Sequence, residues 1–316
     1  MTEHYTRPDV AQLLAMLNML PGPKMHDLPP EGARAIYVAS KDMVDLPVGE
    51  LAVARDLEAP GPVGAIPVRL FDARPDRAAG PAVVFFHGGG FVIGDLDTHA
   101  GFCAEMSRQL DLPVIAVHYR LAPEHPFPAA PEDCEAAARW VAGSPAELGF
   151  KVTGLVLAGD SAGGNLTVVT AMALRDTPAA VPVIAQFPIY PTVDKAEHYA
   201  SYDLFNAGRV LTKEGMAWFD AAYAITGGDW RGAPLHGDHH DMPPTVVMTA
   251  GLDPLRDQGR AYASALIAVG VPVVYREAVG NIHGFVTMRK AIPSAQADVA
   301  RALAALKAVI AEAVGH

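Results

Sequence analysis

The chain has 316 residues, of which 51% are hydrophobic, and its 24 basic and 35 acidic side chains give a formal net charge of −11. This apolar content is enough for one large α/β domain or two small ones and argues against disorder, while the negative charge disfavours nucleic acid and anionic membrane surfaces as partners. Two cysteines, Cys103 and Cys134, provide no disulfide framework, and the sequence contains neither a signal-peptide pattern nor an apolar run of membrane-spanning length, so we expect a cytoplasmic protein.

The N-terminal segment predicts two helices. Val10, Leu13, Leu14 and Leu17 recur at the spacing of an amphipathic helix, and the Pro-Gly-Pro sequence that begins at residue 21 ends it. A second helix is expected from about residue 31 to residue 41. Because no strand pattern surrounds these helices, each must bury its apolar side against another part of the protein.

The rest of the chain alternates between strand and helix patterns, which predicts a mostly parallel sheet covered by helices on both faces. We predict strands over Leu51–Leu57, Ile66–Asp72, Ala82–Phe86, Val114–Tyr119, Leu155–Ala158, Val183–Phe187, Val246–Ala250 and Val271–Arg276. Helices are predicted over Thr98–Leu110, Glu132–Ala142, Leu166–Arg175, Ala261–Val269 and Ala295–Val314. The short turn at residues 59–62 predicts antiparallel pairing of the first two strands at one edge. The long span 190–241 interrupts the alternation and is interpreted as an insertion with a helix near residues 213–224.

A serine occupies a predicted strand-to-helix turn with the sequence Gly-Asp-Ser-Ala-Gly-Gly, residues 159–164. Glycine two residues before and two after Ser161 is the pattern of a nucleophile elbow, because side chains at 159 and 163 would collide as the helix packs back on the strand. The alternative is an ordinary glycine-rich turn, and this motif alone does not decide between the two.

Three glycines follow His87 directly after a predicted strand. Such a loop can present backbone N–H groups without side chains in the way, and we expect Gly88 and Gly89 to form an oxyanion hole together with Ala162. A phosphate-binding loop is the alternative, but neither of its usual glycine patterns is present. His87 is expected to shape the loop rather than to transfer a proton.

Asp253 and His283 each follow a predicted strand, so both should lie with Ser161 at the carboxyl edge of the sheet. The order serine, aspartate, histidine is the one found in α/β-hydrolases. His283 would act as general base toward Ser161, Asp253 would orient the imidazole, and Ser161 would carry the acyl group.

Three other groups could be mistaken for functional ones. Asp160 adjoins the serine, but neighbouring positions on a tight turn point in different directions, so a structural hydrogen-bonding role is expected. Asp257 should lie in the first turn of a helix that starts near Pro254, which leaves Asp253 as the preferred acid. A metal site is not favoured, because none of the following residues lies on a predicted rigid element: His236, Asp238, His239, His240 and Asp241.

Five motifs occur in order along the chain, and their combination is specific: His87–Gly90, Tyr119–Glu124, Gly159–Gly164, Asp253–Asp257 and His283–Phe285. With them the chain resembles the bacterial hormone-sensitive-lipase-like esterases of the branch that carries GDSAG, from about residue 50 to the C-terminus. The resemblance implies an α/β-hydrolase fold with a mostly parallel eight-stranded sheet. It also implies a helical cap formed by residues 1–45 and 190–241 over a catalytic domain of residues 46–316; a helical hairpin packed behind the sheet is the alternative for residues 1–45.

The function that this implies is hydrolysis of short- to medium-chain carboxylic esters, without a cofactor or metal. An amidase or formamidase with the same triad and a non-catalytic small-molecule receptor on this fold are the alternatives. Phe91, Trp218 and Phe219, together with the apolar side of the first helix, are expected to form the wall of the acyl pocket. The last strand, Val271–Arg276, is expected at an edge of the sheet, where it could pair with a second copy of the chain to form a homodimer.

Overall fold

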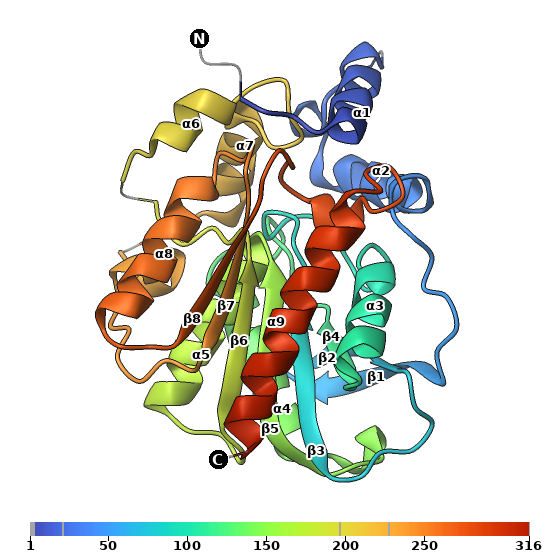
Figure 1. Ribbon diagram of the computed structural model, residues 1–316, viewed down its shortest axis with the longest axis vertical. Coiled ribbons are helices and arrows are strands. Elements are labelled where there is room, and N and C mark those ends of the chain that lie inside the picture. Colours follow the sequence, from blue (N-terminus) through green and yellow to red (C-terminus); the bar gives the residue numbers. More distant parts are fainter. Residues whose placement is uncertain (1–3, 21, 196, 227, 316) are drawn as a thin grey trace.

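The computed structural model describes residues 4–20, 22–195, 197–226 and 228–315. Within these ranges, eight strands form one sheet in the order β1-β2-β4-β3-β5-β6-β7-β8 (Figure 1). Each predicted strand is present, with ends that differ from the prediction by a few residues. The strands are β1 (Val53–Pro60), β2 (Ala65–Asp72), β3 (Gly80–Phe86), β4 (Val114–Val117), β5 (Val152–Asp160), β6 (Val183–Ile189), β7 (Thr245–Ala250) and β8 (Val273–Ala278).

The sheet is mostly parallel, as predicted. The pairs from β4 through β3, β5, β6 and β7 to β8 are all parallel. β1 and β2 form the expected antiparallel hairpin at one edge, and β2 is also antiparallel to β4. Because the parallel strands point the same way, the loops that follow β3, β5, β7 and β8 meet at one end of the sheet, where open α/β sheets bind their ligands.

Helices cover both faces of the sheet. Those in the described ranges are α1 (Pro8–Met19), α2 (Pro30–Val44), α3 (Ala100–Leu110), α4 (Ala129–Ala142), α5 (Ala162–Asp176), α6 (Ala200–Phe205), α7 (Lys213–Tyr223), α8 (Arg256–Ala268) and α9 (Ala295–Gly315). Residues of α3 and α9 share a buried core with one face, and residues of α4, α5 and α8 share a second core with the other (Figure 1). Across the described residues we find no helix whose length and hydropathy would suit a membrane span.

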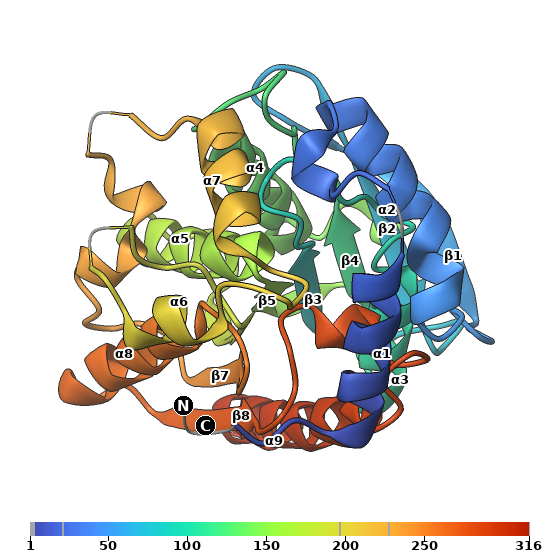
Figure 2. The ribbon, with the colours of Figure 1, turned by 90° about the horizontal axis from the view of Figure 1, so that it is seen from above.

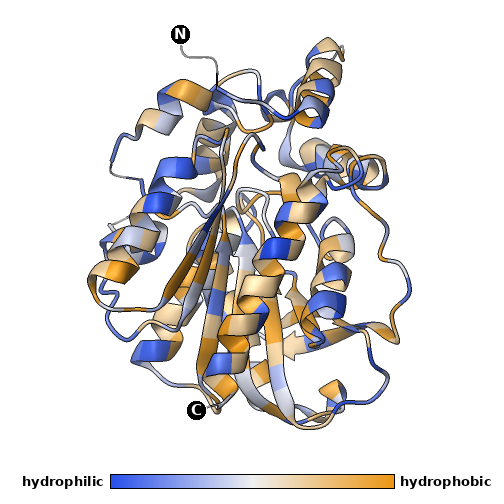
Figure 3. Cartoon of the chain, viewed as in Figure 1, coloured by the Kyte–Doolittle hydropathy of each residue, from blue (hydrophilic) through white to orange (hydrophobic). Residues whose placement is uncertain are grey.

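The strands at the centre of the sheet are mostly apolar (Figure 3). In β5 every position except Thr153 is buried. A strand that is covered on both faces reads as a continuous apolar run rather than an alternating one, which is why this strand could be predicted from its composition. The rigid centre of the molecule therefore lies directly below the turn that carries Ser161.

The span between β6 and β7 is the predicted insertion. It contains α6, α7 and two short 3₁₀ turns, η3 (Trp230–Gly232) and η4 (Pro234–His236). Figures 1 and 2 show α6 and α7, together with α1 and α2, at the end of the sheet where the parallel strands have their carboxyl termini. Another 3₁₀ turn, η1 (Met25–Asp27), connects α1 to α2.

Candidate active site

Ser161 stands between the end of β5 and the first residue of α5, with a backbone φ of 56°. A positive φ is uncommon for a residue other than glycine and carries a cost of about 1–3 kcal/mol, so the surroundings must enforce it. The Ser161 N–H donates to the Ile189 carbonyl at 2.8 Å. A methyl group at Gly163 would overlap the Phe86 carbonyl oxygen, so only glycine lets α5 approach β3 this closely.

His283 lies between Ser161 and Asp253. Its Nε2 is 2.8 Å from the Ser161 Oγ, and its Nδ1 is 2.7 Å from Asp253 Oδ2. Asp253 is fully buried, and its other oxygen accepts the Leu255 N–H at 2.8 Å. The Tyr190 ring packs on the imidazole with a centroid distance of 4.6 Å. A buried carboxylate on one nitrogen leaves the other nitrogen free to accept a proton from the serine.

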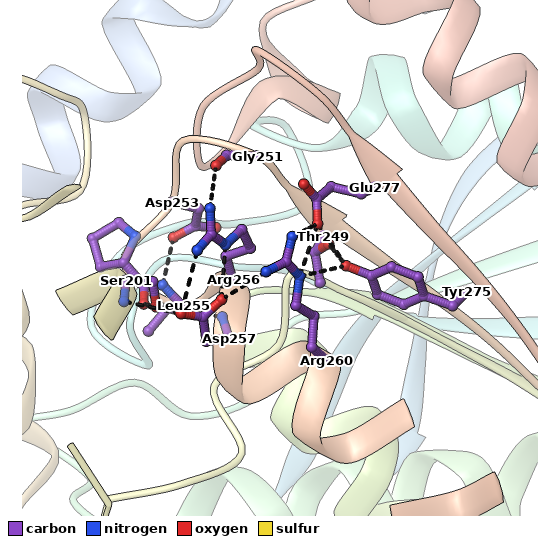
Figure 4. Close-up of polar contacts among 11 residues, drawn as sticks. Ser201, Thr249, Gly251, Asp253, Leu255, Arg256, Asp257, Arg260, Tyr275 and Glu277 are labelled. Carbon is purple, nitrogen blue, oxygen red and sulfur yellow. Dashed lines mark hydrogen bonds and ion pairs between the residues drawn. The ribbon is translucent and has the colours of Figure 1, made fainter. Parts of the chain in front are cut away.

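Asp257 is held away from the imidazole. It lies in the first turn of α8, where it accepts hydrogen bonds from the Ser201 N–H at 3.0 Å and from the Arg256 side chain at 2.8 Å (Figure 4). Burial raises the pKa of Asp257, but the hydrogen bond and charge of Arg256 outweigh it, and the pKa lies below its ordinary value. The two carboxylates therefore have separate surroundings, and only Asp253 contacts His283.

The glycine loop differs from the prediction at one position. The Gly88 N–H donates to Asp160 Oδ1 at 2.7 Å, so the expectation that Gly88 contributes to an oxyanion hole is wrong. Gly89, Gly90 and Ala162 line the cavity beside Ser161, and within the described chain we find no acceptor for the N–H of any of the three. The available donors are therefore those of Gly89, Gly90 and Ala162.

Asp160 has the structural role predicted for it. In addition to the Gly88 N–H, its carboxylate lies 3.2 Å from His99 Nε2 and accepts a hydrogen bond from the Tyr190 hydroxyl at 3.3 Å. This buried group ties the residue before the nucleophile to the glycine loop. The sequence contains no signal for this contact, because the two partners are 72 residues apart.

His87 lies beneath the loop rather than in the cavity. Its Nδ1 is 2.8 Å from the Gly88 carbonyl oxygen, and its ring stacks on Tyr119 with a centroid distance of 4.3 Å. Burial, with His99 and His118 close by, holds the pKa of His87 well below its usual value. An uncharged imidazole in this position supports the glycine loop, as expected.

A cavity of about 510 Å³ opens beside Ser161 and His283. Phe91 and Phe219 lie on its wall, as predicted, but Trp218 does not line it: the indole packs on Phe219 at 5.1 Å and against the core. Sequence reasoning missed Met25 and Tyr37, which contribute the N-terminal part of the wall. No periodic pattern marks these two residues as facing a cavity.

The apolar side of α1 faces elsewhere. Val10 and Leu13 are buried in the core that α9 shares with the sheet, and Leu17 is 37% exposed. Arg7 fixes the start of the helix by pairing with Asp298 at 2.5 Å. None of these residues lines the cavity, so the expectation that this side of α1 forms the mouth of the acyl pocket is wrong.

The histidines that follow α7 have separate partners. His236 Nε2 is 2.9 Å from Asp194, whereas His240 Nδ1 is 2.7 Å from Asp238. In the part of the chain that the structure describes, no group of three potential ligands is arranged to hold a metal ion. The Tyr119–Glu124 motif braces its loop, with Arg120 paired to Asp133 at 2.8 Å.

A serine, a histidine and an aspartate joined by hydrogen bonds at the carboxyl edge of a mostly parallel sheet form the arrangement of the α/β-hydrolase class. The alpha/beta hydrolase fold family matches residues 83–287 of this sequence. The chain belongs to this family, as its motifs predict.

Relatives that are named as ester hydrolases resemble the chain over most of its length. Esterase LipI of Mycobacterium tuberculosis is 37% identical over 287 residues, which cover 89% of each protein. The ethyl acetate hydrolase of Pseudomonas putida is 32% identical and covers 95% of this chain and 98% of its own. A crystal structure of a mutant of LAE6, an alpha/beta hydrolase enzyme from the metagenome of Lake Arreo, Spain, superimposes with a TM-score of 0.91 at 34% identity and covers 96% of this chain and 98% of that one.

Proposed function

We propose that the chain is a serine carboxylesterase that hydrolyses short- to medium-chain acyl esters. The observation that carries this proposal is the hydrogen-bonded path from Asp253 through His283 to the Ser161 Oγ at the wall of the cavity. Relatives that are named as an esterase and as an ethyl acetate hydrolase support the choice of esters.

The reaction would proceed in two halves. In the first, His283 Nε2 takes the hydroxyl proton while Ser161 Oγ attacks the ester carbonyl, and the N–H groups of Gly89, Gly90 and Ala162 receive the negative charge on the carbonyl oxygen. The C–O bond to the alcohol then breaks, and the imidazolium returns its proton to the leaving alkoxide. In the second half, His283 deprotonates a water that attacks the acyl-Ser161 ester, and the same N–H groups hold the second oxyanion. The bond between Ser161 Oγ and the acyl carbon then breaks, the imidazolium returns its proton to Oγ, and the carboxylic acid leaves.

The substrate would lie under a cap. We assign residues 1–45 and 190–241 to this cap and residues 46–316 to the catalytic domain. Phe219 on α7, Met25 on η1 and Tyr37 on α2 support the division, because they enclose a cavity whose base comes from the loops at the carboxyl edge of the sheet. Phe91 and Phe219 would contact the acyl group, and a cavity of about 510 Å³ would limit its length.

A chromogenic ester tests the proposal. With p-nitrophenyl butyrate, Ser161→Ala and His283→Ala should each lose nearly all of kcat and retain a residual rate of roughly 10³–10⁴ over water from the remaining groups. Ser264→Ala is the matched control, because this exposed serine on α8 donates only to the Arg260 carbonyl. A phosphonate inhibitor should label wild type and Ser264→Ala but not Ser161→Ala. Full activity of Ser161→Ala would refute the assignment, and faster turnover of the matched p-nitroanilide than of the ester would favour an amidase.

We also propose that two copies associate through β8, the last strand of the sheet, whose outer edge pairs with no other strand of the described chain. A cytoplasmic location agrees with the two cysteines, since Cys103 and Cys134 are free thiols in the structure.

A further inference from the structure

The glycine loop has a positive φ at three successive residues, beginning with Gly89 at 115°. Gly90 has a φ of 59° and Phe91 a φ of 65°, both in the left-handed region. Glycine enters this region freely, but a residue with a bulky side chain does so only when its surroundings enforce it. Because the Gly90 N–H is one of the donors assigned to the oxyanion hole, whatever enforces this conformation also places that donor.

Two aromatic residues of α7 contact these two loop residues. The rings of Tyr223 and Phe91 stack face to face, with a centroid distance of 3.8 Å and an interplanar angle of 5°. Phe219, one turn earlier on α7, packs so closely on Gly90 that a methyl group there would overlap its ring. Residues four apart on a helix lie on the same side, so α7 presents both rings to the loop together.

The loop is also held by polar contacts to other parts of the chain. The Ala122 N–H donates to the Phe91 carbonyl at 2.9 Å, and Arg34 Nε donates to the Val92 carbonyl at 2.8 Å. These bonds fix the carbonyl groups, but they do not touch the Phe91 ring. Tyr223 supplies the flat surface on which that ring rests.

Tyr223 has no contact with the cavity itself. It is 2% exposed and does not belong to the cavity wall, and its own ring is supported edge-on by Phe127 at 5.6 Å. Within the described chain its hydroxyl has no hydrogen-bond partner. The ring face, rather than the hydroxyl, is therefore what this residue contributes.

We propose that Tyr223 is a positioning residue, which holds Phe91 in its left-handed conformation and thereby aligns the N–H groups of Gly89 and Gly90 with the developing oxyanion. The proposal rests on the esterase function proposed above. It makes the inserted helix α7 part of the apparatus that assembles the oxyanion hole, in addition to a wall of the pocket.

The test compares Tyr223→Ala with Tyr223→Phe on an ester and on the matching thionoester, in which sulfur replaces the carbonyl oxygen. Sulfur accepts hydrogen bonds weakly, so the ratio of kcat/KM for the two substrates reports on the oxyanion hole. Tyr223→Ala should lower kcat for the ester by about 10²-fold, comparable to the loss of one donor, with KM changed by no more than about twofold. The oxo-to-thiono ratio should fall with it, whereas Tyr223→Phe, which keeps the ring face, should retain the wild-type ratio.

Tyr223→Leu covers the case in which the alanine variant does not fold, because leucine fills much of the space but cannot stack. It should lower the ratio in the same direction. A folded alanine or leucine variant with the wild-type ratio would overturn the proposal, provided that Ser161→Ala is inactive. If Ser161→Ala keeps its activity, the esterase mechanism itself has failed, and the two failures are thus distinguished.

Discussion

Asp253 and Asp257 lie four residues apart, and only the first contacts the imidazole. Asp253→Asn should lower kcat by about 10⁴-fold, because an amide in this position favours the wrong imidazole tautomer. Asp257→Asn, the matched control, should have a much smaller effect, because this side chain binds Ser201 and Arg256. Steady-state kinetics on both folded variants checks the assignment, and equal losses would show that the acid has been misassigned.

The buried His87 and the half-buried His118, whose rings stack on each other, predict acid sensitivity. Burial lowers the pKa of both His87 and His118 from the ordinary value of 6.5. The unfolded chain therefore binds protons below about pH 6.5 that the folded chain does not, so stability is fully present above this pH and is lost as the pH falls toward the folded-state pKa values. The slope is about 1.4 kcal/mol per pH unit for each such proton.

Urea unfolding between pH 7.5 and pH 5.5 measures this slope. His118→Gln should make the dependence shallower by up to one proton. His125→Gln, a change at an exposed histidine seven residues along the chain, is the matched control. An unaltered slope in His118→Gln would contradict the prediction for that residue.

At the scale of single residues, the sequence predicted the positions that local chemistry determines and missed those that depend on distant contacts. The elbow around Ser161 could be predicted, because the tight turn requires glycine at fixed offsets. The sequence could not show which of the glycines after His87 has a free N–H, because the contact between Gly88 and Asp160 exists only in the folded protein.

Among the helices, α1 and the η1 turn have different surroundings, and this difference yields a test of the pocket. Met25→Ala should enlarge the cavity and move the optimum of a p-nitrophenyl ester series toward longer acyl chains, with each additional buried methylene contributing about 0.8 kcal/mol, or roughly fourfold in kcat/KM. Leu14→Ala, on α1, should lower the melting temperature without moving the optimum, since Leu14 packs in the core next to α9. A shift with Leu14→Ala but not with Met25→Ala would contradict the assigned wall.

Periodicity explains why α1 was predicted as a helix and why the surface against which it packs was predicted wrongly. Apolar residues at helical spacing show that one side of a helix is buried, but not against which surface. The surface against which α1 packs is determined by the Arg7–Asp298 ion pair and by the core shared with α9. Asp298 and α9 both lie near the C-terminus, far from α1 in the sequence. The helix could be predicted because periodicity is a local property of the sequence. Its packing partners could not, because they are distant in the sequence.

For the whole molecule, the alternation of strands and helices was sufficient to predict a mostly parallel sheet and its antiparallel first pair. The antiparallel pairing of β2 with β4 was not predictable, because it depends on β4 lying between β2 and β3 rather than after them. The position of β8 as the last strand was predicted correctly, and the proposed dimer depends on it.

The outer side of β8 provides a test of association. The Pro272 carbonyl accepts the Thr245 N–H from β7, so by strand alternation the N–H of Val273 points away from the sheet. Val273→Pro removes this outward donor while leaving the bonds to β7, and it should convert a dimer into a monomer. Val273→Ala keeps the donor and should remain dimeric. Light scattering measures both, and a strictly monomeric wild type would refute the dimer.

Hydrogen bonds anchor the first residues of the insertion between β6 and β7, and they determine where the insertion could be replaced by that of another hydrolase. The Thr192 N–H donates to the Ser161 carbonyl at 3.3 Å, the Thr192 carbonyl accepts from Asn165 at 2.9 Å, and the Val193 N–H donates to Gln258 Oε1 at 2.5 Å. Because the groups that residues 192 and 193 contribute are main-chain groups, a chimera that gave the chain a different path from the end of β6 would lose these bonds and disturb the nucleophile. A chimera joined after Asp194 would place a new pocket wall on an unaltered catalytic domain.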